Sequence, residues 1–284
     1  AKSFIATRGA IGLAMNMSVP LMRYLQLQAT QAWVKYGLAG AMGLTAFSII
    51  GTQSRGAMLG ATAMGFMLLM KGRRRFLFAI LVIVAAYSVV SFMPAKWSDR
   101  MGTISEYEQD ASAMGRINAW HFAYNMAKDR PLVGGGFESF RAWLFDRYAP
   151  QPNNVHDAHN IFFEVLGEHG FVGFGLYCLL MLMTWRSCST IINRTKNSPE
   201  AKWLSDLASM TQVSLAAYVI SGSFLGLAYF DFYYFLVALT VLSKVELRKY
   251  EEAGVLGRQA QAAAKPLLGA RSPALAPHAR AEKR

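Results

Sequence analysis

Charged residues are scarce in this chain. Only 16% of its 284 residues are Asp, Glu, Lys or Arg, whereas 54% are hydrophobic. Soluble domains usually carry about 25% charged residues, so the composition argues against that class. The apolar residues also occur in blocks long enough to cross a hydrocarbon core, which takes ~20 helical residues. The sequence therefore predicts an all-α, polytopic helical membrane protein.

Cysteine is nearly absent, and no signal peptide is visible. Cys178 and Cys188 lie on one expected helix, about 15 Å apart along its axis, which is too far for a disulfide. The start of the chain, AKSFIATRGAIGLAMNM, has no initiator Met and lacks the basic start, short apolar run and small-residue cleavage site of a secretory signal. We expect a fragment that lacks preceding membrane helices.

Despite its few charges, the chain has a formal net charge of +12. In a soluble protein this excess would suggest a nucleic-acid partner. Here the basic residues cluster in the connections between apolar blocks, as in the KGRRR run at 71–75. Membrane topology explains such clusters better, and we expect no nucleic-acid partner.

The apolar blocks predict seven membrane helices. Their expected ranges are 9–25, 33–51, 55–70, 76–93, 159–185, 206–225 and 230–246. Alternation then puts every basic connection on one side, which the positive-inside rule makes cytoplasmic. The turn at 52–57, the long segment 94–158 and the turn at 222–231 lie outside. We expect a membrane domain over 1–250 and a disordered cytoplasmic tail, rich in Ala, Pro and Arg, over 251–284.

The segment 94–158 is too long for a simple connection, since loops of this size are usually functional or disordered. Aromatic and aliphatic residues recur in it at helical spacing, which predicts an external cap of short amphipathic helices: Ile117, Trp120, His121 and Tyr124, then Phe137, Phe140, Trp143 and Leu144. We expect Arg116 to open the first of these helices and Pro131 to end it. Its apolar stripe would be Ile117, Trp120 and Tyr124.

Arg55 is the first candidate for chemistry. It lies in TQSRGAML between two apolar blocks, at the external surface of the expected membrane. A cation there is costly without an anionic partner, so it suggests function. The structural alternative is an Arg that snorkels to lipid phosphates, which is less usual on the external side. We expect Arg55 to bind an anionic substrate group.

The external segment offers further cationic candidates. Most of its arginines are expected to be solvated, but Arg116 is the first choice to reach an anionic ligand, and Arg130 is a further one. The triple glycine 134–136 exposes backbone N–H groups of the kind that cradle phosphate. No Gly-Lys-Ser/Thr follows it, so a plain turn is the more common interpretation.

The stretch NNVHDAHNIFFEVLGEHGFVGFGLY (153–177) places polar residues at the start of an apolar helix. Asp157 is expected to cap that helix, and His159 to lie in its first turn. Glycines follow on the same face and allow close helix contact, so His159 is expected to face inward. His159 is the catalytic candidate, and His156 and Asn160 are candidates for substrate binding.

Two other interpretations of the histidines stay open. They are polar residues at the membrane interface, or His156 and His159 form a structural metal pair. A metal site needs more ligands than two, and the sequence does not indicate which carboxylates would converge. We therefore expect no metal.

These motifs together resemble the O-antigen ligase superfamily. Its pattern of His, then Asn, Ser or Gln, nine residues, Gly, two residues, and Gly, Thr or Tyr is matched by His159, Asn160, Gly170 and Gly173. SRGA around Arg55 is similar to the family's essential external Arg. GRINAW followed by RPLVGGGFESF is similar to its periplasmic-loop signature. DAHNIFFEVLGEHGFVGFGL is closest to O-glycosylation ligases of the exosortase-associated type.

The resemblance implies a GT-C-like glycosyltransferase in the bacterial inner membrane, with its active site facing the periplasm. The donor would be a glycan on undecaprenyl pyrophosphate. The acceptor hydroxyl would belong to a glycolipid such as lipopolysaccharide, to another glycan or to a protein. Arg55 and Arg116 would stabilise the leaving pyrophosphate, and His159 would act as general base in an inverting transfer. No metal or nucleotide cofactor is implied.

Two alternatives to a ligase remain at this stage. An O-antigen polymerase uses a lipid-linked glycan as acceptor as well as donor. A transporter or lipid-linked glycan binding protein would use Arg55 to hold an anion without catalysis, and broken helices at mid-membrane would favour it.

Overall fold

The computed structural model describes residues 8–71 and 111–256. This part of the chain is all-helical, without strands, as predicted. Its helices are α1 (Arg8–Gln28), α2 (Ala32–Gly51), α3 (Arg55–Lys71), α6 (Ala111–Asp129), α7 (Ala142–Tyr148), α8 (Ile161–Thr195), α9 (Lys202–Gly222) and α10 (Asp231–Glu252). The expected membrane helix 76–93, the first part of the external segment and most of the tail lie outside the described residues.

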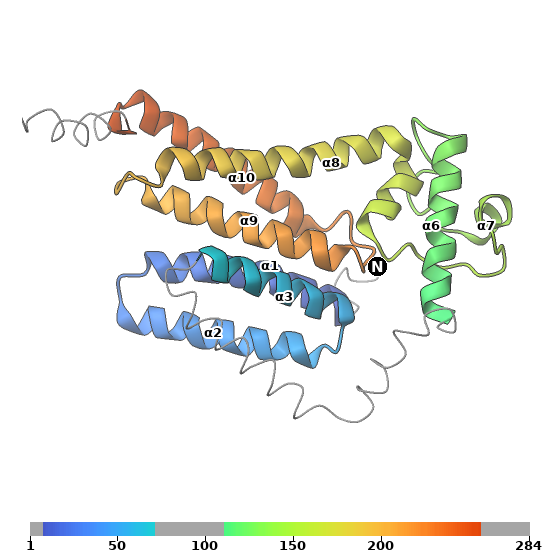
Figure 1. Ribbon diagram of the computed structural model, residues 1–284, viewed down its shortest axis with the longest axis horizontal. Coiled ribbons are helices and arrows are strands. Elements are labelled where there is room, and N and C mark those ends of the chain that lie inside the picture. The colour runs from blue at the N-terminus through green and yellow to red at the C-terminus, as the bar shows by residue number, and fades with distance from the viewer. Residues whose placement is uncertain (1–7, 72–110, 257–284) are drawn as a thin grey trace, which may run out of the picture.

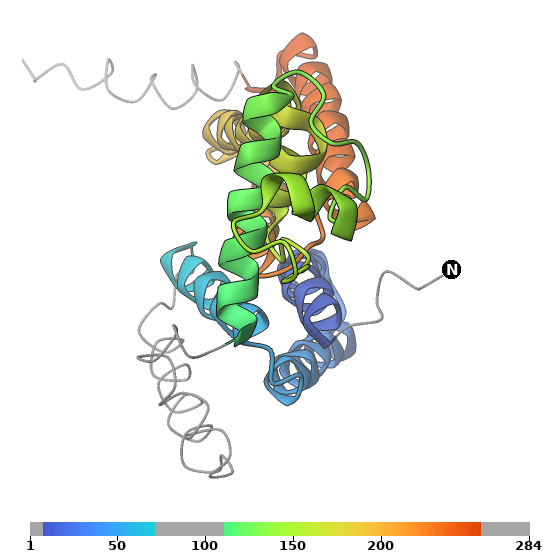
Figure 2. The same ribbon diagram turned by 90° about the vertical axis from the view of Figure 1, so that its right-hand side faces the viewer.

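Six long helices form a bundle, and α6 runs across one end of it (Figure 1). Viewed from that end, α6 covers the ends of the bundle helices, with α7 beside it (Figure 2). The main core brings α1, α8, α9 and α10 together around the fully buried rings of Tyr218 and Tyr233. The helices predicted for the segment 94–158 are thus present as α6 and α7, and the external position of this segment stays a prediction.

The end of the bundle that α6 covers is called the α6 end. The start of α1, the α2–α3 turn and the α9–α10 loop (223–230) meet there. A Cβ placed at Gly9 would lie 2.5 Å from Leu225, and one at Gly56 would lie 2.8 Å from Phe224. The small residues therefore allow close approach. These are the segments that alternation assigned to one side of the membrane.

The opposite end gathers the other set of connections. Lys71 Nζ donates to Ser209 O (3.1 Å), and Arg194 pairs with Glu251 at 3.2 Å. Lys71 and Arg194, which belong to two of the basic connections, thus lie at this end, while the side of the membrane that it faces stays a prediction.

Two helices in the described part of the chain, α2 and α8, are long and apolar enough to cross a membrane. Large apolar side chains on α2 remain uncovered, and Trp33 and Phe47 are each 75% exposed. Uncovered side chains of this kind fit a lipid-facing surface. The passage of the other expected helices through a membrane stays a prediction.

A kink at Gly170 divides α8. Gly170 has φ 66° and ψ −167°, which separates 161–169 from 171–195. Beyond the kink, Phe171 N donates to Pro131 O in the turn after α6 (2.8 Å). The single helix expected at 159–185 is therefore wrong in two respects: it is broken, and it continues to Thr195. This docking contact, which the local pattern does not reveal, holds the break.

The helix α6 ends before Pro131 as predicted, but it starts at Ala111, so Arg116 does not open it. The predicted apolar stripe is also wrong. The fully buried face consists of Ala119, Phe122, Ala123, Met126 and Ala127. That face packs against α7 and the start of α8, which hides it, while Ile117, Trp120 and Tyr124 border an open groove.

Candidate functional site

The N-cap of α8 is Asn160, not Asp157 as predicted. Asn160 Oδ1 accepts hydrogen bonds from Phe162 N (2.9 Å) and Phe163 N (3.3 Å). Its Nδ2 donates to Ser223 O in the α9–α10 loop (3.0 Å). Asp and Asn are both good N-cap residues. Asn160 differs in that its amide also binds Ser223, which is distant in the sequence. Asp157 stays exposed.

His159 therefore precedes the helix and does not lie in its first turn. Its φ of 43° is left-handed, a conformation that non-glycine residues adopt at a cost and that clusters at functional sites. The chain is anchored on both sides of it. Ala158 O accepts from Trp120 Nε1 (2.8 Å), and Asn160 holds the α9–α10 loop. The half-buried imidazole is thus fixed by its neighbours, and the predicted helix face running from His159 to Gly173 does not exist.

Arg116, His156 and Asp157 lie close enough to His159 to act on its charge. Burial, followed by the Arg116 guanidinium, lowers the pKa of His159 below its usual 6.5. His156 also lowers this pKa, whereas Asp157 raises it. The net effect leaves the imidazole neutral at neutral pH, which is the form a general base requires. The structure thus brings together Arg116, His156 and His159, three of the site residues that the sequence singled out.

Two buried nitrogens in this cluster have no hydrogen-bond partner among the described residues. They are Arg116 Nε and His156 Nδ1. The His156 ring lies over α6 at Gly115, where an added Cβ would lie 2.8 Å from it. Buried polar atoms are normally paired, so a group that binds at this cluster could satisfy them. Arg116 Nε is a donor, and such a ligand would have to accept its hydrogen bond.

Arg55 is exposed at the first position of α3, at the α6 end. Its neighbour Gly56 packs against Phe224. Asn160 binds the residue before Phe224, so Arg55 and the start of α8 border the same loop. Arg130 is placed differently: it is exposed after the last turn of α6 and acts on Tyr148, about 20 Å along the helix axis from Arg116.

A polar stripe on the first part of α8 was not recognised from the sequence. Asn160, Glu164 and Glu168 recur every four residues, and each binds the α9–α10 loop. Glu164 Oε2 accepts from Ala228 N (3.0 Å), and Glu168 Oε2 accepts from Tyr229 Oη (2.6 Å). The i, i+4, i+8 spacing was the available signal.

The triple glycine forms a docking turn. Gly135 N donates to Gly167 O and Gly136 N to Glu168 O, both at 2.9 Å. These carbonyls belong to the last turn of 161–169, which lacks helical partners for them. These N–H groups are already hydrogen-bonded and cannot bind a phosphate, so the phosphate-cradle interpretation of the glycines is wrong.

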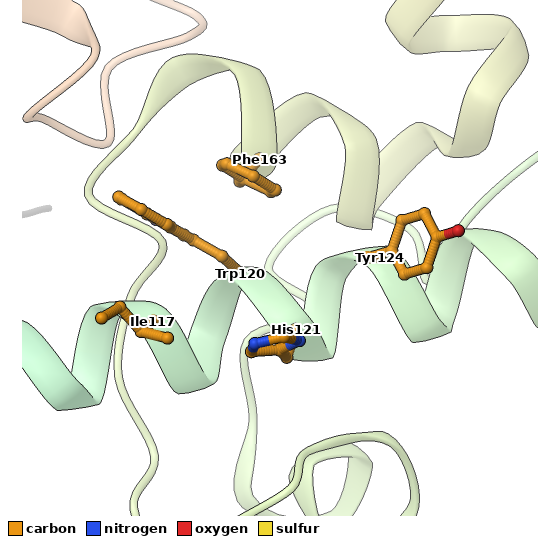
Figure 3. A pocket seen from close by; sticks show the side chains of 5 residues that line it. All are labelled: Ile117, Trp120, His121, Tyr124 and Phe163. Atoms are coloured by element: carbon orange, nitrogen blue, oxygen red, sulfur yellow. The ribbon is translucent and has the colours of Figure 1, made fainter.

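An open groove lies beside the cluster on α6. It is lined by Ile117, Trp120, His121, Tyr124 and Phe163 (Figure 3). Trp120 stacks on Phe163 with ring centroids 5.0 Å apart. Because Trp120 also holds Ala158, this contact ties α6 to the segment that carries His159.

Within the described ranges, no group of three or more His, Cys, Asp or Glu side chains is arranged to hold a metal ion. His156 and His159 belong to one cluster, but their charged neighbours include Arg116. A cation beside this guanidinium would be repelled. The chemistry of the cluster suits an anion.

Comparison with known proteins adds a family. The sequence model of the O-antigen ligase family matches residues 30–178, just over half of the chain. The match includes Arg55, Arg116 and the His159 segment. A search of curated proteins finds no match. The chain belongs to the O-antigen ligase family.

Proposed function

We propose that this protein transfers a glycan from undecaprenyl pyrophosphate to an acceptor hydroxyl on the periplasmic side of the bacterial inner membrane. One observation carries the proposal: His159, with its lowered pKa, lies beside Arg116 in a cluster with two buried, unpaired nitrogens. A base and an anion-binding group are the two things this transfer needs. Family membership supports the same class of reaction.

In this scheme the imidazole of His159 takes the proton from the acceptor hydroxyl. The hydroxyl oxygen attacks C1 of the donor sugar as the bond from C1 to the pyrophosphate oxygen breaks. The pyrophosphate leaves with the electron pair, and the configuration at C1 inverts. Negative charge grows on the leaving group, so a guanidinium nearby stabilises the transition state more than the ground state.

Arg116 and Arg55 are the proposed partners of the pyrophosphate. Arg116 offers a partly buried guanidinium with a free donor, and planar donors of this kind bind phosphate oxygens in pairs. Arg55 lies at the start of α3, next to the loop that Asn160 binds. His156 is the third proposed contact, while Asn160 acts by positioning, since its amide is occupied by the cap and by Ser223. Arg130 lies about 20 Å along the helix axis from Arg116, so we do not include it among the pyrophosphate contacts.

A transfer assay in proteoliposomes tests the proposal. The donor is lipid-linked glycan extracted from the native membrane, and the readout is a new glycosidic bond. We expect His159→Ala and Arg55→Ala each to abolish transfer while protein levels stay normal. Arg147→Ala is the matched control, because Arg147 is exposed on α7 and its contact with Asp129, at 3.5 Å, is a surface pair of small value.

The products separate the proposed ligase from its alternatives. One transferred block indicates a ligase, and a stepwise ladder indicates a polymerase. Movement of the glycan across the membrane without a new bond indicates a transporter. Full activity of His159→Ala or Arg55→Ala would overturn the proposed mechanism. The scheme uses no metal, so we expect activity to survive EDTA.

A further inference from the structure

In the polar stripe on α8, the carboxyl oxygen Oε1 of Glu164 is the atom that makes no hydrogen bond within the described residues. Asn160 uses both ends of its amide, as described above. Glu168 is 5% exposed, and both of its oxygens are bound, Oε1 by Glu138 N (2.7 Å) and Oε2 by Tyr229 Oη. Glu164 differs, because Ala228 N binds only Oε2. Oε1 has no hydrogen bond within the described residues.

Glu164 lies next to the segment that carries the catalytic candidate. A Cβ placed at Gly226 would lie 3.6 Å from Glu164 Oε2 and 3.8 Å from His159 N. Both groups therefore border the same point of the α9–α10 loop.

The cation of the site lies on the side of His159. The charged groups that act on Glu164 within the described residues are Glu168 and Asp157. Asp157 also acts on His159, but there Arg116 acts as well. A pyrophosphate is attracted to Arg116, whose buried Nε has no partner among the described residues. The group that borders Glu164 is therefore expected to be neutral and to carry hydrogen-bond donors.

We infer that Glu164 accepts a hydrogen bond, through Oε1, from a hydroxyl of the sugar that the pyrophosphate carries. This inference rests on the proposed function, because that function supplies a sugar bonded directly to the pyrophosphate. With the pyrophosphate held at Arg116, the attached sugar is the nearest neutral group. A carboxyl oxygen accepts a hydrogen bond from a hydroxyl. Glu164 is thus a sugar-recognition residue that no motif identified.

Glu164→Gln separates this role from a structural one. The amide oxygen of Gln still accepts from Ala228 N, so the loop keeps its bond, while an NH2 group, which cannot accept a hydrogen bond, replaces Oε1. Glu168→Gln is the matched control. It makes the same change one turn further along α8, at a carboxylate whose oxygens both serve the fold. We expect this control to lower the melting temperature and to leave sugar recognition intact.

The experiment compares two probes on purified full-length chain in nanodiscs. One is undecaprenyl pyrophosphate, and the other is the native undecaprenyl-pyrophosphate-linked glycan. We expect the wild type to bind the glycan-bearing lipid more tightly than the bare lipid. Glu164→Gln should weaken the binding of the glycan-bearing lipid only, by roughly 2- to 10-fold, the affinity in one neutral hydrogen bond.

The binding measurements have three outcomes that overturn the role of Glu164. Equal wild-type affinity for the two probes, or an unchanged preference in Glu164→Gln, overturns the inference. A preference lost equally in Glu168→Gln also overturns it, since the effect is then structural. The proposed function is judged separately by transfer. If the wild type forms no glycosidic bond but keeps a preference that depends on Glu164, the function fails and the recognition residue stands.

Discussion

Replacing Gly170 by Ala tests the kink that shapes the site. At φ 66° and ψ −167°, the backbone occupies a region that is essentially restricted to glycine. An added Cβ would also lie 2.5 Å from Pro131 O and 2.7 Å from Arg130 O. Those are backbone atoms, which cannot swing aside as a flexible side chain would. Either the turn after α6 moves away or the helix straightens.

The expected cost follows from these contacts. Strain at such a position costs about 1–3 kcal/mol, and loss of the hydrogen bond from Phe171 N to Pro131 O adds about 0.5–1.5 kcal/mol. We therefore expect Gly170→Ala to destabilise the protein by roughly 2–4 kcal/mol. Gly175→Ala on the same helix is the control. Nothing lies within 4 Å of a Cβ there, so the helix should gain roughly 0.5–1 kcal/mol.

Thermal unfolding in detergent, followed by tryptophan fluorescence, measures both variants. The expected order of melting temperatures is Gly175→Ala at or above the wild type, and Gly170→Ala clearly below it. Glycan transfer should fall in Gly170→Ala, because the docking turn and the first part of α8 lose their shared geometry. A Gly170→Ala protein as stable as the wild type would refute the reasoning, since the glycine would then not be required by the kink.

Two further predictions concern the start of α8. Asp157→Asn should move the acid limb of kcat/KM to lower pH, and Arg116→Gln should move it to higher pH, because the carboxylate raises the pKa of His159 and the guanidinium lowers it. Activity depends on the neutral imidazole, so activity is lost as the pH falls through the pKa of His159. If the acid limb moved in the same direction in both variants, His159 would be excluded as the titrating base. Asn160→Ala should cost roughly 1–3 kcal/mol from the lost cap and the lost bond to Ser223. Asn160→Ser keeps a cap and should recover part of that loss in urea or thermal unfolding, whereas an unaltered Asn160→Ala protein would show that the cap is dispensable.

The helical class and most helix positions could be predicted from apolar blocks and breakers. Pro131 fixes the end of α6 whatever the rest of the fold does, because its ring cannot continue the helix. Counting spans also placed the turn of Arg55 and the α9–α10 loop at the same end of the bundle. These features depend on local chemistry and on alternation, which the sequence carries directly.

What could not be predicted depends on contacts between distant segments. Asp157 and Asn160 are equally good caps locally, and the bond to Ser223, some sixty positions away, distinguishes them. Gly170 reads as an ordinary small residue in a helix until Pro131 docks against it. The polar stripe gave a periodic signal, but the role of Glu164 appears only when the loop that occupies its neighbours is in place.

The most direct test of the account is the fate of the donor in the presence of His159→Ala. Purified protein is incubated with lipid-linked glycan and acceptor membranes, and both free undecaprenyl pyrophosphate and the new glycosidic bond are quantified. The account predicts that the wild type forms the two products in equal amounts, and that His159→Ala binds the donor but forms neither. Transfer by His159→Ala at the wild-type rate, or glycan movement by the wild type without a new bond, would contradict it.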